Sequence, residues 1–378
     1  MKAHTLLITG GHPTPALAVI DECAKNFPNI KVVFAGRKYA NQKESLQTYE
    51  YDEIIQRSIT FIPVAFMRGW SGLVSFPQSF ITSLQILKKY RPNAILSFGG
   101  YVALPFVCAA RLCRLPVYTH EQTAVMGTAN RLISALSQKV FLSFPNTKIA
   151  SPKYVYTGNP IRRQILVPPA TSPLDIPYDK PILLITGGNL GSHSINTMIF
   201  PILQQLLKTF TVVHQTGNIQ AYGDYESALK VKRELDENLR LHYVPLPYLS
   251  TDAWSYILSK CSMVISRSGA NTFIELVAAQ KPCVLIPLPW SAHGEQRKHA
   301  QILQEAGVGE ICEQTTGTTN LYETIMRVFD NRSKYIEKYP TLQHLYVPDA
   351  ANSILKAIVF SAAKAFRIST FIKKPKKV

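Results

Sequence analysis

The sequence predicts two doubly wound, Rossmann-like α/β domains that face each other across a central cleft. The six residues LLITGG occur at Leu6–Gly11 and again at Leu183–Gly188, each time before an expected helix. Short apolar runs alternate with helical stretches along the chain, which is typical of parallel sheets covered by helices on both faces. The stretch Leu166–Pro181 contains five prolines and no helical periodicity, so we expect an interdomain linker there.

The elements follow the same rhythm in both halves. Strands are predicted for TLLITG, KVVFAG, AILSFG and PVYTHEQ in the first half, and for PILLITGG, FTVVHQTG, SMVIS and PCVLIPL in the second. Helices are predicted between them, for example PTPALAVIDECAKN and TFIELVAAQ. We therefore expect a first domain at residues 1–165, a linker at 166–181 and a second domain at 182–349. A last helix at about 350–366 can pack back on the first domain, and residues 367–378 form a basic tail.

Composition narrows the class of protein. A chain of 378 residues with 46% hydrophobic residues can bury two cores and is not disordered. The six cysteines form no CxxC pair or zinc-like Cys/His cluster, so we expect buried reduced thiols and no metal site. The uncharged run Ala94–Ala110 is shorter than the ~20 residues of a membrane span and contains glycines and a proline. No secretory signal is visible, because Thr9-Gly10-Gly11 interrupts the first apolar run.

The charge is unevenly distributed. The chain carries a formal net charge of +17. Residues 54–174 contain thirteen basic residues and one acid, residues 367–378 contain five basic residues and no acid, and the rest is balanced. This asymmetry favours a polyanionic partner, either nucleic acid or an anionic membrane, where each Lys or Arg contributes about 1 kcal/mol. A merely solvated basic face is the alternative.

Neither glycine turn matches a nucleotide fingerprint of the common kinds. The first reads GGHPTP and the second GGNLGS, which are neither GxGxxG nor GxxxxGK[ST] and so argue against a dehydrogenase or a P-loop NTPase. Glycines let the backbone turn sharply and approach a ligand at the carboxyl edge of a sheet. The amides around Gly188 and Asn189, before a helix, suit a diphosphate. A purely structural turn remains the alternative.

Two later segments of the second half carry polar groups suited to a nucleotide sugar. In SRSGANTFIEL we expect Ser268 or Asn271 to cap a helix and Gly269 to let a ligand come close. Glu275 lies about two turns further on, and its carboxylate can accept hydrogen bonds from both hydroxyls of a ribose. Glu295 and Gln296 begin a helix and can bind sugar hydroxyls. Ordinary solvated helix residues are the alternative in each case.

The first half offers candidates for catalysis and acceptor binding. His12 follows the first glycine turn, and an imidazole there suits a general base because its pKa lies near working pH. His120 and Glu121 end another strand, and Glu121 is the single acid of residues 54–174, so we expect it to pair with a base or orient a loop. We assign His12 and Glu121 as candidate catalytic residues, and His120 with Gly99-Gly100-Tyr101, a backbone nest for phosphate, as acceptor-binding.

Seven motifs together resemble the MurG family, the family 28 glycosyltransferases that add N-acetylglucosamine to lipid I in peptidoglycan synthesis. They occur in the family's order over about residues 5–315: TGGHPTPALAV, SFGGYVALP, YTHEQ, TGNPIRR, TGGNLGS, SRSGANTFIEL and the EQ of HGEQRKHA. The resemblance implies a GT-B fold and an inverting, metal-independent transfer without a cofactor. It also implies UDP-GlcNAc as donor, a polyprenyl-pyrophosphate-linked acceptor, and a peripheral location at the cytoplasmic side of the cell membrane.

The resemblance also assigns roles to residues. His12 is implied to be the base for the 4-hydroxyl of the muramyl sugar, and Arg162 to contact the donor near the hinge. Thr123 stands where the family has an asparagine, and Asn189 belongs to GGNLG where the family has GGSQG, which affects the identity of the sugar. The residues assigned to the donor site are Thr9, Gly10, Gly11, Thr123, Arg162, Gly188, Asn189, Tyr248, Leu249, Ser268, Gly269, Glu275, Glu295 and Gln296.

An apolar segment with an arginine indicates membrane contact. In FMRGWSGLVSFP, the side chains of Phe66, Trp70 and Phe76 can enter the membrane interface, where aromatic residues are stable. The family resemblance places a hydrophobic patch here, beside the acceptor site. The basic tail at 367–378 can add a second contact. Burial of the three aromatic side chains in the core is the alternative.

Three other functions compete with this one. A related GT-B glycosyltransferase would share the donor site and use another UDP-sugar and lipid. A sugar-nucleotide epimerase would share the architecture but needs carboxylates in the cleft, which the scarcity of acids in the first half disfavours. A nucleic-acid-binding protein would leave the glycine turns unexplained and lacks a recognisable module, so we expect no nucleic acid partner.

Overall fold

The computed structural model describes residues 4–39, 47–64, 70–145, 151–188, 190–315 and 317–359, with the backbone alone for residues 49 and 70–73. The chain divides into two compact units. Unit 1 comprises Met1–Arg162 and Val347–Val378, and unit 2 comprises Arg163–Tyr346. Each unit is built around one parallel sheet, which confirms the predicted fold class of two doubly wound α/β domains.

The sheet of unit 1 has seven strands in the order β3-β2-β1-β4-β5-β6-β7. Every pairing is parallel. The order reverses between β1 and β4, so the turns that follow these two strands flank the switch point where doubly wound sheets bind ligands. In chain order the elements are β1 (His4–Thr9), α1 (Pro13–Asn26), β2 (Ile30–Gly36), α2 (Tyr49–Gln56), β3 (Thr60–Pro63), α3 (Trp70–Tyr90), β4 (Ala94–Ser97), η1 (Tyr101–Ala103), α4 (Leu104–Leu112), β5 (Val117–Glu121), α5 (Thr128–Leu136), β6 (Lys139–Leu142) and β7 (Tyr154–Tyr156).

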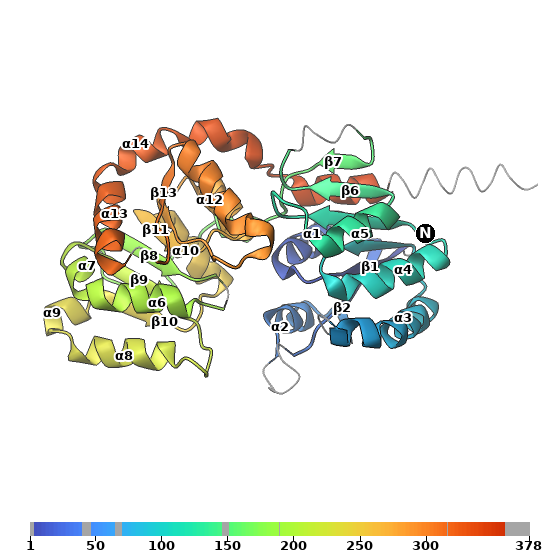
Figure 1. The fold of residues 1–378 in the computed structure, drawn as a ribbon, viewed down its shortest axis with the longest axis horizontal. Coiled ribbons are helices and arrows are strands. Elements are labelled where there is room, and N and C mark those ends of the chain that lie inside the picture. Colours follow the sequence, from blue (N-terminus) through green and yellow to red (C-terminus); the bar gives the residue numbers. More distant parts are fainter. Residues whose placement is uncertain are drawn as a thin grey trace, which may run out of the picture. The chain divides into compact units, whose positions relative to one another are not determined.

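Both faces of this sheet are buried under helices (Figure 1). Leu6 and Ile8 of β1 lie in one core cluster with α1, whereas Leu7 lies in another with α3, α4 and α5. Successive residues of a strand point to opposite faces, so a strand covered on both sides must be apolar throughout. The uncharged run at 94–110 is therefore β4, a glycine turn, η1 and most of α4. In the described part of the chain, no helix is long and apolar enough to cross a membrane.

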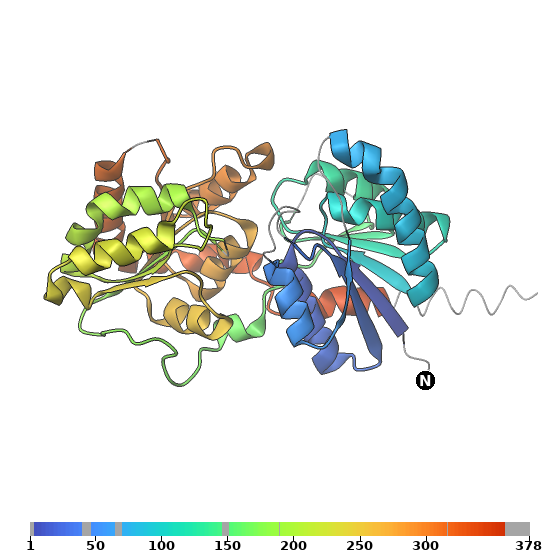
Figure 2. The ribbon, with the colours of Figure 1, turned by 90° about the horizontal axis from the view of Figure 1, so that it is seen from below.

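The end of the described chain belongs to the core of unit 1. Residues 350–359 are helical, and Ile354, Leu355 and Ile358 are buried in the cluster that contains β1 and α1. Figure 2 shows this red segment beside the blue strands of unit 1. The chain leaves unit 1 after Arg162 and returns at Val347. The tail at 367–378 lies outside the described residues.

The sheet of unit 2 has six parallel strands in the order β10-β9-β8-β11-β12-β13. Leu183 and Ile185 of β8 lie in a core cluster with α6, α7 and α13. The order reverses between β8 and β11, so this unit has a switch point of its own. Its elements are η2 (Arg163–Leu166), β8 (Ile182–Thr186), α6 (His193–Ile199), η3 (Phe200–Ile202), α7 (Leu203–Thr209), β9 (Thr211–Gln215), α8 (Asp224–Glu234), α9 (Glu237–Arg240), β10 (Tyr243–Leu246), α10 (Thr251–Lys260), β11 (Met263–Ser266), α11 (Ala270–Ala279), β12 (Cys283–Leu285), η4 (Ala292–Gly294), α12 (Glu295–Glu305), β13 (Gly309–Ile311), α13 (Thr318–Asp330), α14 (Arg332–Ile336) and η5 (Tyr339–Leu345).

The proline-rich stretch packs on unit 2. Residues 167–181 form no helix or strand, and Ile176 among them is buried. The carbonyl of Pro177 accepts a hydrogen bond from the Thr211 hydroxyl, and the Lys180 ammonium donates to the Leu207 carbonyl at 2.8 Å. The stretch is therefore an ordered strap along its own unit.

Candidate functional site

Two glycine turns of unit 1 touch each other at its switch point. Gly10 follows β1 with φ +149°, and a Cβ atom on it would lie 2.8 Å from the backbone of Phe98. The Gly11 amide donates a hydrogen bond to the Gly99 carbonyl at 3.0 Å. A side chain at Gly10 would collide with Phe98, so the two turns can meet only because this position is glycine. Together they form one backbone surface at the edge of the sheet.

The turn after β4 is shaped by its own glycines. Gly99 and Gly100 have φ of +72° and +79°, a region that other residues rarely adopt. A Cβ atom on Gly99 would lie 2.9 Å from the Asn130 side chain, and one on Gly100 would lie 3.4 Å from the Gly11 amide nitrogen. Tyr101 opens η1 and is 43% exposed. The structure thus places Gly99-Gly100-Tyr101 directly beside the first turn.

The two histidines of this edge differ in exposure. His12 is the extended N-cap residue of α1 and is half-buried. His120 is buried at the end of β5, with its Nε2 3.3 Å from the Gly158 carbonyl oxygen and 3.1 Å from the Ser143 hydroxyl. Burial lowers the pKa of His120 to about 3, with a smaller lowering from nearby His12, although the Gly158 carbonyl opposes the shift. His120 is therefore neutral near pH 7, and His12 is the more accessible of the two.

Glu121 organises the loop that follows β5. Its Oε1 accepts hydrogen bonds from the Thr123 amide at 3.0 Å and the Thr123 hydroxyl at 2.7 Å. Its Oε2 accepts from the Asn130 side-chain amide at 2.8 Å and from the Gly127 amide at 3.3 Å. These contacts tie residues 122–127 to the start of α5. The carboxylate thus has the surroundings of a loop-orienting group, and the hydroxyl of Thr123 points to it.

The glycine turn of unit 2 is held even more tightly. A Cβ atom on Gly187 would lie 2.2 Å from the Ser192 amide nitrogen, and one on Gly191 would lie 2.1 Å from the Thr216 carbonyl oxygen. Gly188 has φ +85° and faces open space. The chain therefore folds back on itself after β8 and rests on the loop after β9. Asn189, expected at the tip of this turn, lies outside the described residues.

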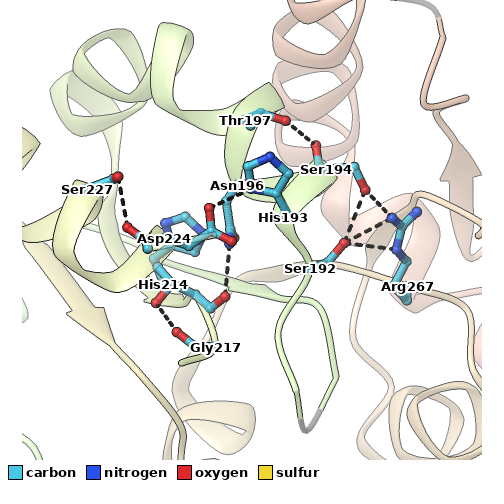
Figure 3. Close-up of polar contacts among 12 residues, drawn as sticks. Ser192, His193, Ser194, Asn196, Thr197, His214, Gly217, Asp224, Ser227 and Arg267 are labelled. Carbon is cyan, nitrogen blue, oxygen red and sulfur yellow. Dashed lines mark hydrogen bonds and ion pairs between the residues drawn. The ribbon is translucent and has the colours of Figure 1, made fainter. Parts of the chain in front are cut away.

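Arg267 is a buried cation beside this turn (Figure 3). Its guanidinium donates to the hydroxyls of Ser192 and Ser194, and also to Gln314 Oε1 and the Ile286 carbonyl. Burial lowers its pKa to about 10, so it stays charged at neutral pH. None of the carboxylates among the described residues pairs with it. The sequence analysis missed Arg267, although an arginine within the SRSG motif directly after a strand was a usable signal.

The turn after β11 joins the start of α12. The expectation that Ser268 or Asn271 caps a helix is wrong, because Gly269 is the N-cap of α11 and no side chain caps it. The Ser268 hydroxyl donates instead to the Gln296 carbonyl at 2.7 Å. A Cβ atom on Gly269 would meet nothing within 4 Å. Glu275 is buried further along α11.

The start of α12 is fixed by its own loop. Gln296 Oε1 accepts from the Leu288 amide at 3.0 Å, and the Gln296 amide donates to the Ser291 hydroxyl. Glu295 is the first residue of α12 and is half-buried, as is Gln296. His299, one turn later, has its Nδ1 3.0 Å from the Ser268 carbonyl oxygen. The segments after β11 and β12 therefore form a single hydrogen-bonded edge.

The loop after β10 lies at the same end of the sheet, because all six strands are parallel. Tyr248 is 68% exposed, and Leu249 is half-buried. Unit 2 thus collects at one edge the segments after β8, β10, β11 and β12, which contain most of the residues assigned to the donor. Such an edge can bind an anionic ligand through the backbone amides of a glycine turn and a neighbouring buried cation.

Arg162 occupies the last position of unit 1. Its Nη1 lies 3.2 Å from Glu53 Oε2 on α2, and Arg57 binds the same carboxylate oxygen at 2.8 Å. Arg57 also binds Asp21 on α1. The sequence analysis did not anticipate this cluster, which joins Arg162 to side chains of α2 and α1 that are far from it in the sequence.

The segment predicted to contact a membrane, Phe66–Pro77, lies partly outside the described residues. Phe66 and the side chain of Trp70 are outside the described residues. Phe76 is half-buried on α3 and stacks on Phe80. Val74 and Ile81 of the same helix are 81% and 55% exposed and were missed, because the sequence does not show which face of α3 is covered. No group of His, Cys, Asp and Glu suited to a metal ion occurs in the described part of the chain.

Known proteins match this chain across both units. The family model of the glycosyltransferase family 28 N-terminal domain matches residues 9–142, and that of the C-terminal domain matches residues 182–354. This chain belongs to glycosyltransferase family 28. A curated relative from Desulfotalea psychrophila is 30% identical over 360 residues, which covers 92% of this chain and 93% of the relative. That protein is named UDP-N-acetylglucosamine–N-acetylmuramyl-(pentapeptide) pyrophosphoryl-undecaprenol N-acetylglucosamine transferase.

Solved structures agree with the family 28 assignment. MurG from Acinetobacter baumannii has a TM-score of 0.69 and 26% sequence identity, covering 94% of this chain and 99% of that chain. UDP-GlcNAc 2-epimerase from Neisseria meningitidis, solved with UDP-GlcNAc, has a TM-score of 0.64 and 16% identity over similar shares, a likeness of fold alone. The matches confirm the family inferred from the seven motifs, the GT-B fold and the enzyme class, a glycosyltransferase.

Acid should destabilise the protein through its buried histidines. Burial lowers the pKa of His299 to about 4 from 6.5, against a smaller opposing effect of the Ser268 carbonyl. Between these values the unfolded state binds more protons than the folded one, so stability falls as pH falls, by about 1.4 kcal/mol per pH unit. Urea unfolding at several pH values should show this slope reduced in His299→Asn, whose side-chain amide can replace Nδ1 as the donor to the Ser268 carbonyl. Equal slopes in wild type and variant would contradict the assignment.

Proposed function

We propose that this enzyme transfers N-acetylglucosamine from UDP-GlcNAc to lipid I, a polyprenyl-pyrophosphate-linked muramyl pentapeptide, and so forms lipid II for peptidoglycan. The observation that carries the proposal is the extent of the match. A relative named for this reaction aligns with 92% of the chain, through both units, at 30% identity. The contacting glycine turns of unit 1 and the glycine turn beside Arg267 in unit 2 support the proposal, which assigns the acceptor to the former and the donor to the latter.

The proposed chemistry is a single displacement with inversion at the anomeric carbon. His12 takes the proton from the 4-hydroxyl of the muramyl sugar, and that oxygen attacks C1 of N-acetylglucosamine. The bond from C1 to the diphosphate oxygen breaks, and UDP leaves with the electron pair. Its developing charge is stabilised by the amides of the unit 2 glycine turn, by Arg267 and by Arg162. His12 suits the role because it is half-buried at the sheet edge, whereas His120 is sealed in.

The donor is held mainly by unit 2 in this proposal. The amides around Gly188 and Asn189 bind the diphosphate, and the open space at Gly269 admits the nucleotide beside Glu275, which binds the ribose. The loop after β10, with Tyr248 and Leu249, faces the uracil. Glu295 and Gln296 bind the sugar hydroxyls, and the Gln296 side-chain nitrogen has no hydrogen-bond partner among the described residues. The family resemblance also assigns Thr9, Gly10 and Gly11 of unit 1 to the donor.

The acceptor is held by unit 1. Gly99, Gly100 and Tyr101 bind its pyrophosphate in this proposal, and the Gly99 amide also donates to the Ser97 hydroxyl at 3.1 Å. His120 and Glu121 act in this scheme by fixing the surrounding loops, since the contacts of both are already made within unit 1. Thr123 contributes to the donor end through the same loop.

A second candidate is a family 28 enzyme that uses another UDP-sugar and another lipid. Two departures from the family's motifs favour it, namely Thr123 in place of asparagine and GGNLG in place of GGSQG. Both lie in segments assigned to the donor, so they bear on the sugar more than on the reaction type. A comparison of donors distinguishes the two candidates.

Turnover is the direct test. Purified protein should transfer the labelled sugar from UDP-GlcNAc to lipid I presented in vesicles. This transfer should be faster than transfer from UDP-glucose or UDP-galactose. His12→Ala should lower kcat by about 10²–10⁴-fold, as expected on loss of a general base. His4→Ala, an exposed histidine of the same unit, is the control. Hydrolysis of UDP-GlcNAc without transfer to lipid I would contradict the proposal that lipid I is the acceptor. Full turnover by His12→Ala would show that His12 is not the general base.

We also propose that unit 1 binds the surface of an anionic membrane from the cytoplasmic side. Val74 and Ile81 on α3 are exposed, and Lys88 and Lys89 lie in the last turn of the same helix. The excess of bases in residues 54–174 adds long-range attraction to anionic lipid. The proposal also assigns Phe66, Trp70, Phe76 and the basic tail to membrane contact.

Vesicle pelleting tests the membrane proposal. The wild type should pellet with phosphatidylglycerol vesicles and much less with neutral ones. The double variant Val74→Glu, Ile81→Glu should stay in the supernatant, because two charges replace the apolar contact. Leu241→Glu, an exposed apolar position of unit 2, should pellet like the wild type. Pelleting that is indifferent to lipid charge or to the double variant would contradict the proposal.

A further inference from the structure

The segment that follows the unit 2 glycine turn is held from two sides (Figure 3). Ser192 and Ser194 both accept hydrogen bonds from the buried guanidinium of Arg267. His193, between them, contacts a different part of the unit. Its Nδ1 lies 2.8 Å from Asp224 Oδ1, at the start of α8. The segment is therefore fixed in place, and His193 sits one residue beyond the turn.

The imidazole of His193 is fixed in both position and plane. Tyr222 stacks on it with ring centroids 4.4 Å apart and an interplanar angle of 10°. Asp224 is buried, whereas the side chain of His193 is 44% exposed. The bond to Asp224 assigns a proton to Nδ1 and turns Nε2 away from the carboxylate. Nε2 has no hydrogen-bond partner among the described residues.

The setting of this imidazole points to an anionic ligand. An ion pair at the surface contributes little to folding stability. Burying a carboxylate is costly, so linking α6 to α8 is by itself a poor explanation for the contact between buried Asp224 and half-exposed His193. The turn next to it lies beside Arg267, a buried cation whose partners among the described residues are neutral acceptors. A nucleoside diphosphate at that turn would supply the missing negative charge.

We propose that His193 binds a phosphate oxygen of the nucleoside diphosphate through Nε2–H, with Asp224 and Tyr222 as its positioning residues. In this contact Nδ1–H donates to Asp224 and Nε2–H donates to the phosphate oxygen. The inference rests on the proposed function, to which it adds a phosphate-binding residue. It assigns His193 to the diphosphate and not to the nucleoside.

Calorimetric titration with UDP and with uridine tests the assignment on the full chain. His193→Ala should raise the Kd for UDP about tenfold, the usual effect of one hydrogen bond to a charged group. The Kd for uridine, which has no phosphate, should not change. Asp224→Asn should weaken UDP binding by a smaller factor, and His193→Arg should restore most of it through a new donor. His344→Ala, an exposed histidine of the same unit, is the matched control.

The outcomes separate this inference from the proposed function. Unchanged UDP binding in His193→Ala overturns the inference and leaves the glycosyltransfer proposal intact. Equal weakening of UDP and uridine also overturns it, since that result indicates a structural role. A wild type that binds UDP with the predicted variant effects but transfers no sugar would sustain the phosphate contact while the proposed function fails.

Discussion

The close approach of backbone to backbone at the carboxyl edges of the two sheets is the constraint on which the rest depends. At Gly191 the chain passes so near Thr216 that a single added carbon would lie 2.1 Å from its carbonyl oxygen, and Gly10 meets Phe98 in the same way in unit 1. These contacts occur because parallel strands end at a common edge and the strand order reverses there. They bring a tight glycine turn to the edge of each sheet, where a phosphate group can approach the backbone closely.

Buried polar side chains keep these turns in one conformation. Glu121 uses both carboxylate oxygens to hold the loop after β5, and Arg267 uses its guanidinium to hold the segment after β8. A buried charge is costly unless its hydrogen bonds are satisfied, so each of these side chains specifies a single loop geometry. Glu121 and Arg267 differ in the charges that surround them. Glu121 is paired with neutral donors in a unit rich in bases, whereas Arg267 lies in the unit proposed to receive an anionic donor.

The sequence predicted the strands and turns well because their signals are local. LLITGG, a buried apolar run before two glycines, predicts a strand and a turn wherever it occurs, and both copies are found so. The predicted Ser268 cap was wrong because Gly269, one residue later, is the N-cap of α11, and the Ser268 hydroxyl donates to the carbonyl of Gln296, 28 residues away. Ser192 lies 75 residues from its partner Arg267, and Asp224 lies 31 residues from its partner His193, so no local pattern could predict these contacts. Which residues of α3 are exposed could not be predicted either, because exposure depends on which other elements cover each face of the helix.

Donor binding by a Gly191→Ala variant tests the central claim most directly. Residue 191 has φ +75°, a backbone conformation that alanine rarely adopts, and the added methyl group would collide with the carbonyl oxygen of Thr216. The turn must therefore open to accommodate alanine. We predict that titration with UDP-GlcNAc shows binding weakened by at least about a hundredfold, the effect of two or three lost hydrogen bonds to phosphate, with the far-ultraviolet circular dichroism unchanged. Gly127→Ala, where a Cβ atom meets nothing within 4 Å, should bind as the wild type does. Wild-type affinity in a folded Gly191→Ala protein would contradict the glycine turn as the donor site.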